Sequence, residues 1–148
     1  VIFASRYDTY AFDYPEKYLY WKGFDFFIFD RKLADFFLKS DILSVFEYCL
    51  GAPWWDYWLP CIALKKGFKL KYMKNFDIFH ILHKINYDLE DYRKIGINFS
   101  NEFIPGYHNV LEKLSLLDKK QLDYELGNVI TKTFLRFLME NSESILLE

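Results

Sequence analysis

The sequence predicts an α/β fold with a mixed sheet, flanking helices and a C-terminal amphipathic helical segment. Short apolar runs typical of buried strands alternate with helical patterns, and Gly or Pro residues separate many of them. The last part of the chain repeats apolar residues at steps of three and four, which indicates a helix with one apolar face. A chain of 148 residues with 52% apolar and 27% charged residues suits a globular domain with one core.

The first third of the chain is expected to contain two strands and two short helices. Apolar runs predict strands at Val1–Ser5 and Phe24–Phe29. Between them, Arg6–Tyr20 mixes aromatic residues with Asp and Pro and is interpreted as an irregular loop. The apolar spacing within Arg31–Leu38 suits a short helix, and a further helix is expected over Asp41–Leu50.

A central helix is predicted over Trp54–Lys66. Pro53 suits its first turn, because proline lacks the amide that a helix start leaves unpaired. Gly67 follows the last predicted residue and is a typical C-terminal stop. Pro60 lies inside the segment and is expected to kink it.

Strands are expected next at Phe68–Met73 and Phe76–Leu82, followed by helices at Asp88–Gly96 and Leu111–Leu117. A longer amphipathic helix is expected from Asp118 onward. Its apolar positions are Leu122, Leu126, Val129, Ile130, Phe134, Phe137 and Leu138. We therefore divide the chain into an α/β part over residues 1–104 and a helical C-terminal extension over residues 105–148.

Charge and cysteine content narrow the class of protein. The net charge is -2 and the basic residues form no strongly basic run, so nucleic acid is not an expected partner. Cys49 and Cys61 lack zinc-ligand spacing and suit buried thiols in a reducing compartment. No apolar run approaches the roughly 20 residues that cross a bilayer. These features predict a cytoplasmic location, and a start at Val1 rather than Met suggests a further domain upstream.

The densest aromatic cluster surrounds one carboxylate. Trp54, Trp55 and Trp58 flank Asp56, which falls in the first turn of the predicted helix. The helix dipole favours a carboxylate there, and a carboxylate beside an aromatic pocket can act as the general base for a sugar hydroxyl. The same residues equally suit a capping Asp56 beside tryptophans that fill a core.

Two further groups of residues are candidates for a site. His80 and His83 lie three apart at the end of a predicted strand and are possible metal ligands, although such residues face opposite sides unless the chain turns between them. Asp25 near the start of a predicted strand and Arg31 just after it stand where ligands meet α/β sheets. Each group also suits an ordinary role, as structural histidines and as solvated charges beside a buried strand.

In their order along the chain, these segments resemble the C-terminal, acceptor-side half of a group of glycosyltransferases with the GT-A fold. The resemblance covers roughly residues 24–84, and Pro-x-Trp-Asp-x-Trp is its more specific piece. The matching residues are Gly23, Asp25, Phe27, Ile28, Phe29, Arg31, Gly51, Pro53, Trp55, Asp56, Trp58, His80 and His83.

The resemblance implies transfer of a sugar from a nucleotide-sugar donor to a saccharide acceptor. Asp56 would be the base, and one of His80 and His83 would bind a divalent metal, Mn or Mg, that holds the diphosphate. Asp25, Arg31 and the three tryptophans would shape the acceptor site. The family's Asp-x-Asp motif is absent from this chain, so the resemblance assigns the nucleotide and metal to an upstream half.

Two other functions remain open from the sequence. The tryptophan cluster also suits a carbohydrate-binding or protein-interaction module without catalysis, and it suits a structural domain with an aromatic core. Metal dependence separates the enzyme from the binding module. Exposure of the tryptophan rings separates the binding module from the structural domain, because a core hides its rings.

Overall fold

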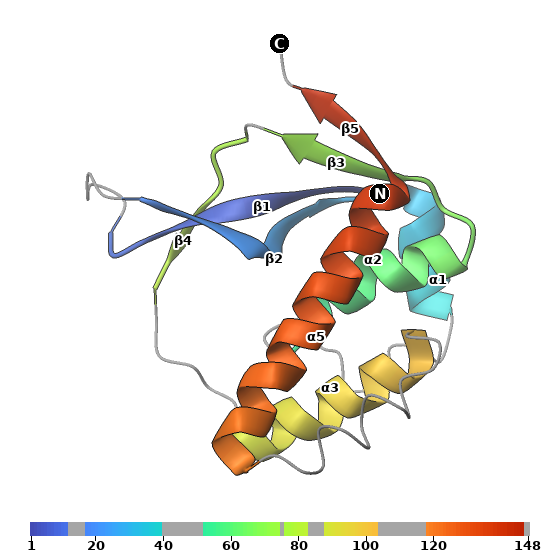
Figure 1. Ribbon diagram of the computed structural model, residues 1–148. Coiled ribbons are helices and arrows are strands. Elements are labelled where there is room, and N and C mark those ends of the chain that lie inside the picture. The colour runs from blue at the N-terminus through green and yellow to red at the C-terminus, as the bar shows by residue number, and fades with distance from the viewer. Residues whose placement is uncertain (12–16, 40–51, 75, 83–87, 104–117, 147–148) are drawn as a thin grey trace.

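The computed structural model describes residues 1–11, 17–39, 52–74, 76–82, 88–103 and 118–146. They form an α/β structure with a mixed, curled sheet, as the sequence predicts. The strand order is β2-β1-β3-β5, and β4 also pairs with β1. Figure 1 shows the sheet lying above helices α2, α3 and α5, with α5 rising toward the sheet and leading into β5.

The N-terminal hairpin is longer than predicted. Strand β1 covers Ile2–Thr9, and the antiparallel β2 covers Tyr18–Ile28. The expectation of an irregular loop over Arg6–Tyr20 is therefore wrong at both of its ends. Polar Arg6 and Asp8 alternate with Tyr7 and Thr9 in the two-residue period of a strand, and pairing with β2 satisfies the backbone there.

The hairpin contains a bulge at Asp25. Ala4 pairs with Phe26 and Ser5 pairs with Phe24, so Asp25 has no opposite residue in β1. A second shift follows, because the next pair is Arg6 with Tyr20. Extra residues of this kind bend a strand and re-aim its side chains.

The other edge of β1 is shared by two strands. Strand β3 (Leu70–Lys74) runs parallel to the start of β1, and β4 (Phe79–Ile81) runs parallel to its end. Strand β5 (Ser142–Leu146) lies parallel to β3 along its full length. The sequence did not predict β5, since its residues are largely polar and exposed and only the pairing partner defines them as a strand.

Four helices are described, and all were expected in part. They are α1 (Arg31–Lys39), α2 (Trp55–Lys65), α3 (Leu89–Phe103) and α5 (Lys119–Glu140). Helix α2 contains Pro60 and is followed by Gly67 at φ 82°, a conformation that glycine adopts without strain. Helix α3 is longer than predicted. The helices expected over 41–50 and 111–117 lie outside the described residues.

Aspartates begin the two longest helices. Asp88 Oδ1 accepts a hydrogen bond of 2.8 Å from the Asp91 amide at the start of α3. Asp118 Oδ1 accepts one of 2.9 Å from the Gln121 amide at the start of α5. Each carboxylate therefore pairs an amide that the first helical turn leaves without an internal acceptor.

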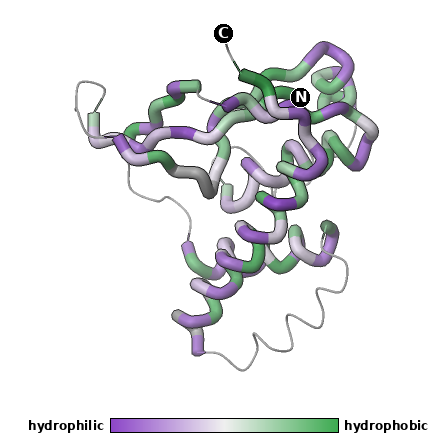
Figure 2. The backbone as a smooth tube through the Cα atoms, turned by 45° about the horizontal axis from the view of Figure 1, so that its top comes forward, coloured by the Kyte–Doolittle hydropathy of each residue, from purple (hydrophilic) through white to green (hydrophobic). Residues whose placement is uncertain are grey.

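One aromatic-rich core joins the sheet to the helices. Phe3 and Phe24 from the hairpin, Tyr57 from α2, Phe99 from α3 and Phe134 from α5 are almost completely buried in it. Hydrophobic and hydrophilic positions alternate along the helices in Figure 2, as expected for helices with one buried face. The C-terminal segment thus contributes a core helix and a sheet strand to the α/β body.

The structure bears on two further expectations, which concern the cysteines and membrane-spanning segments. Cys61 is a buried thiol, and burial raises its pKa above the ordinary value. Cys49 lies outside the described residues. Within the described part of the chain, none of the helices has the length and apolar character needed to cross a membrane.

Candidate functional site

A charged network lies on the end of the hairpin. Arg6 Nε is 2.8 Å from Asp8 Oδ1, and Arg6 Nη1 is 2.7 Å from Asp25 Oδ1. One guanidinium therefore bridges two carboxylates, each through a short charge-assisted hydrogen bond. The side chains of Arg6, Asp8 and Asp25 retain 17%, 15% and 23% exposure, so solvent still reaches the network.

His80 from β4 completes this arrangement. Its Nδ1 lies 3.3 Å from Asp8 Oδ1 and its Nε2 lies 4.0 Å from Asp25 Oδ2. The imidazole therefore contacts both carboxylates that Arg6 bridges. Asp25 and His80 are separated by more than fifty residues in the sequence, and the fold brings them to one place.

Strand geometry explains how these residues meet. Arg6 and Asp8 are two apart in β1, so both side chains lie on the same face. The parallel register places His80 opposite Asp8. Asp25 is the bulged residue of β2, and the bulge re-aims its carboxylate toward Arg6.

Asp56 adjoins this network from helix α2. It lies in the first turn of the helix, as predicted, and its Oδ2 accepts a hydrogen bond of 3.2 Å from the Phe24 amide. Phe24 precedes Asp25 in the bulge. The carboxylate of Asp56 is close enough to Asp25 and Arg6 to interact electrostatically with both.

The surroundings of Asp56 shift its protonation. Burial of the carboxyl group, reinforced by the negative charge of Asp25, raises its pKa to about 6. The Phe24 amide and the Arg6 guanidinium act in the opposite direction. For Arg6 itself, burial alone would lower the pKa, but the Asp25 and Asp8 carboxylates raise it above the ordinary value.

The turn that leads into α2 is strained. Trp54, at the N-cap of the helix, has φ 68° and ψ 3°, a left-handed conformation that is rare for a bulky residue. Its indole Nε1 donates a 3.0 Å hydrogen bond to the Tyr92 carbonyl, which holds the ring in the core. Such strain persists only where the surroundings impose it, and it recurs at functional sites. Here it positions Asp56 two residues later.

The three tryptophans of the predicted aromatic wall are placed differently from one another. Trp54 and Trp58 are only 8% and 7% exposed and belong to the core. Trp55 is half-buried, and its ring centroid lies 5.3 Å from that of Phe27. Of these three rings, Trp55 keeps the most surface for contact with a ligand.

The remaining predicted residues lie away from the network or outside the description. Arg31 is 93% exposed at the start of α1 and is 3.9 Å from Asp35 of the same helix. His83 falls outside the described residues. In the part of the chain that the structure describes, no group of three or more His, Cys, Asp and Glu side chains is arranged to hold a metal ion.

Arg6 and Asp8 were not recognised from the sequence. Their alternation with Tyr7 and Thr9 is a strand signal, but the surrounding aromatics and Pro15 led to the prediction of a loop. A charged pair at a two-residue spacing in a strand places both side chains on one face, and this was the available signal.

The network places a potential base, the Asp56 carboxylate, beside the charged side chains of Arg6 and Asp25. A carboxylate with a pKa near 6 is ionised at neutral pH and still basic enough to accept a proton from a hydroxyl group.

Comparison of the chain with protein-family models, curated proteins and solved structures finds no match. The proposed function therefore depends on the geometry of the site.

Proposed function

We propose that this chain forms the acceptor side of a sugar-transferring enzyme, with Asp56 as the general base. One observation supports it most directly. Asp25, Asp56 and His80 come from separate segments that the sequence singled out independently, and they meet in one network with Arg6. Within this network Asp56 and Arg6 have shifted pKa values, and a shifted group that lies among other titratable side chains is typical of catalytic sites.

In the proposed reaction, the acceptor hydroxyl donates a hydrogen bond to the Asp56 carboxylate. As the hydroxyl oxygen bonds to the anomeric carbon of the donor, the bond from that carbon to the nucleotide diphosphate breaks. The hydroxyl proton passes to Asp56 and later to solvent. Burial supports this role, because a desolvated carboxylate is a stronger base than an exposed one.

The neighbouring residues would orient the acceptor and balance charge. Asp25 and Asp8 have oxygens that can accept hydrogen bonds from further sugar hydroxyls, while Arg6 holds both carboxylates in place. Trp55 would offer a ring face to the sugar. The proposal assigns the nucleotide and its divalent metal, Mn or Mg, to a separate nucleotide-binding part of the protein.

The test uses the full-length protein and a panel of nucleotide-sugar donors with saccharide acceptors, and it measures release of nucleoside diphosphate. Asp56→Asn should lower turnover by about 10²–10⁴-fold, the usual contribution of a general base. Donor binding should not change, because Asp56 contacts the acceptor.

Asp91→Asn is the matched control, since Asp91 also lies in the first turn of a helix but is exposed and outside the network. It should retain wild-type turnover. In wild-type protein, turnover should fall as pH decreases through about 6, where Asp56 becomes protonated. Undiminished turnover of Asp56→Asn would remove the base assignment.

A non-catalytic interaction domain is the second candidate function. Aromatic side chains are exposed where β1 ends and β2 begins, with Tyr10 62%, Tyr18 57% and Phe79 43% exposed. Rings at this position can contact a carbohydrate or a protein partner. Saccharide binding without diphosphate release from any donor would favour this second function.

A further inference from the structure

The sheet contains a gap where β1 changes its partner. Pairing with β3 extends to Phe3, and pairing with β4 begins at Tyr7. Neither strand pairs with Ser5. The parallel register sets Ser5 level with Lys74, so the gap lies beside the carboxyl end of β3. Ligands of open α/β sheets bind near the carboxyl ends of strands where neighbouring connections diverge.

The peptide groups of Ser5 point toward this gap. On this edge of β1, Val1 O accepts from the Lys71 amide, Tyr7 N donates to Ile78 O, and Thr9 O accepts from the Leu82 amide. Val1, directly before β1, and Tyr7 and Thr9 within it have odd numbers, so the odd residues present their backbone groups to this edge. Ser5 follows the same alternation and directs its N–H and C=O into the gap.

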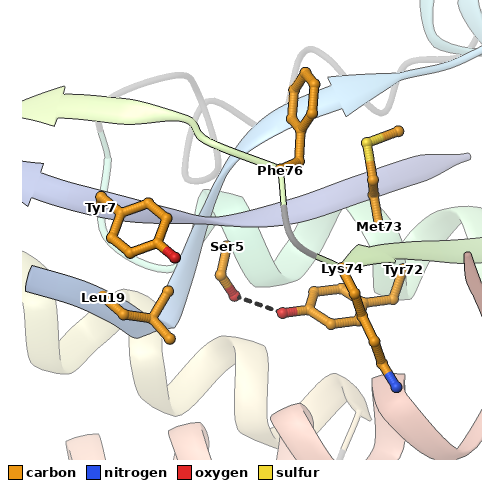
Figure 3. Close-up of a pocket in the computed structure, with 7 residues that line it drawn as sticks. All are labelled: Ser5, Tyr7, Leu19, Tyr72, Met73, Lys74 and Phe76. Atoms are coloured by element: carbon orange, nitrogen blue, oxygen red, sulfur yellow. Dashed lines mark hydrogen bonds between the residues drawn. The ribbon is translucent and has the colours of Figure 1, made fainter. Parts of the chain in front are cut away.

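A cavity of about 250 Å³ occupies the gap. Figure 3 shows its lining, which includes Ser5 and Tyr7 from β1, Leu19 from β2, Tyr72 and Lys74 from β3, and Phe76. Drug-sized ligands bind in cavities of about 300–1,000 Å³, so this one suits a smaller molecule with a single ring. The rings of Tyr7 and Tyr72 supply apolar surface for that ring, while the Phe76 ring packs against Phe26 on the other side of the sheet.

Two hydroxyl groups provide a polar contact inside the cavity. Ser5 Oγ and Tyr72 Oη are 3.1 Å apart, and Ser5 is 8% exposed (Figure 3). A single hydrogen bond between two hydroxyls uses one of their two hydrogens. The other hydrogen can be donated to a ligand oxygen.

A positive charge lies beside these donors. Lys74 is exposed at the end of β3, and its flexible side chain can bring the ammonium group to a ligand in the cavity. None of the residues named as lining the cavity carries a carboxylate. The hydroxyl and ammonium donors together favour an anionic oxygen group.

We infer that this cavity binds a small ring-shaped carboxylate. Its carboxylate would accept hydrogen bonds from the Ser5–Tyr72 hydroxyl pair and from Lys74, and its ring would lie against the Tyr7 and Tyr72 rings. An aromatic acid and a uronic acid share this chemistry. The inference does not depend on the proposed sugar transfer, because the cavity residues differ from those of the Asp56 network.

The test follows backbone amide chemical shifts of the ¹⁵N-labelled chain during titration with benzoate and, separately, with glucuronate. Benzyl alcohol and glucose are the neutral controls. At least one carboxylate should shift the amides of Ser5 and Tyr72 with a Kd of about 1 mM or lower. Its neutral counterpart should bind at least about tenfold more weakly, since it lacks the charge-assisted bonds.

Single substitutions test whether the carboxylate binds in this cavity. Tyr72→Phe keeps the ring that packs against Phe3 and removes the hydroxyl, so it should weaken carboxylate binding by about tenfold. Lys74→Gln should weaken it similarly. Lys71→Gln is the matched control, because Lys71 lies on the same strand, is not among the cavity residues and should leave binding unchanged.

Three results would overturn the inference. These are equal affinity for carboxylates and neutral controls, absence of shifts at Ser5 and Tyr72 with both acids, and unchanged binding in both cavity variants. Binding of benzoate alone or of glucuronate alone supports it and identifies which kind of ring the cavity accepts.

Discussion

At the scale of a single residue, the surroundings of Asp56 suit its proposed role as a base but make its negative charge costly for the folded state. Its carboxylate is placed by the strained Trp54 turn and by the Phe24 amide, and the residue is partly buried beside the negative Asp25. Burial and the charge of Asp25 make ionisation unfavourable, and together they outweigh the Phe24 amide, which favours it. A residue that functions as a base in this position is therefore expected to reduce the stability of the folded state.

The stability cost of Asp56 depends on pH. Its pKa is about 6 in the folded chain, against the ordinary aspartate value of 3.8 that applies to the unfolded chain. Between these values the folded state binds more protons than the unfolded state, so stability decreases as pH rises through this window. At neutral pH the cost reaches at most about 3 kcal/mol.

Asp56→Asn should therefore stabilise the protein above about pH 6, because Asn accepts the Phe24 hydrogen bond without ionising. The gain should be up to about 3 kcal/mol at about pH 8 and clearly smaller at about pH 5. Urea denaturation at the two pH values measures it. Asp91→Asn is again the control, and a gain that does not vary with pH would contradict the shifted pKa.

At the scale of elements, helices α2, α3 and α5 meet at one crowded point. Gly96 of α3 faces Trp54 and Ile130, and a Cβ atom added there would lie 2.8 Å from Trp54 Nε1 and 3.2 Å from Ile130 Cδ1. The close approach of α3 thus depends on glycine. The same contact supports the Trp54 turn that precedes Asp56.

Gly96→Ala should destabilise the fold despite the better helix propensity of alanine. Overpacking of a core costs about 1–3 kcal/mol, and the gain in propensity offsets at most about 1 kcal/mol. Thermal unfolding measures the change. Gly127→Ala is the matched control, since its Cβ would meet the tip of the Tyr92 side chain, which can move. A larger loss for Gly127→Ala would contradict this account.

At the scale of the whole molecule, α5 is part of the core. Leu126, Ile130, Phe134 and Leu138 of this helix are buried together with residues of the sheet. The Phe134 ring centroid lies 4.4 Å from that of Phe99 in α3. Helix α5 and β5 therefore join the first and last parts of the chain in one body.

Phe134→Ala should destabilise the entire structure by about 3–5 kcal/mol, the usual cost of removing a buried phenylalanine. Phe137→Ala on the same helix should cost much less, because Phe137 is 40% exposed. Circular dichroism and tryptophan fluorescence during urea unfolding measure both. One shared transition is expected, and a separate early transition of α5 in the wild-type protein would show that it is an independent extension.

The sequence by itself determined the helices and the α/β class. Apolar spacing predicted α1 and α5, while Pro53 and the Gly67 stop predicted α2. These features depend on local periodicity and on residues at helix ends, which a single sequence contains. The same local information placed Asp56 in a first helical turn.

Only the tertiary structure decided which residues share a site. The bulge that re-aims Asp25, the register that sets His80 opposite Asp8, and the pairing that makes β5 a strand all arise between distant segments. The alternation within one strand shows which of its residues share a face, but it does not identify the strand or the residue with which each one pairs. In the folded chain Arg6 and Asp8 therefore belong to the network, and Trp54 and Trp58 are buried in the core.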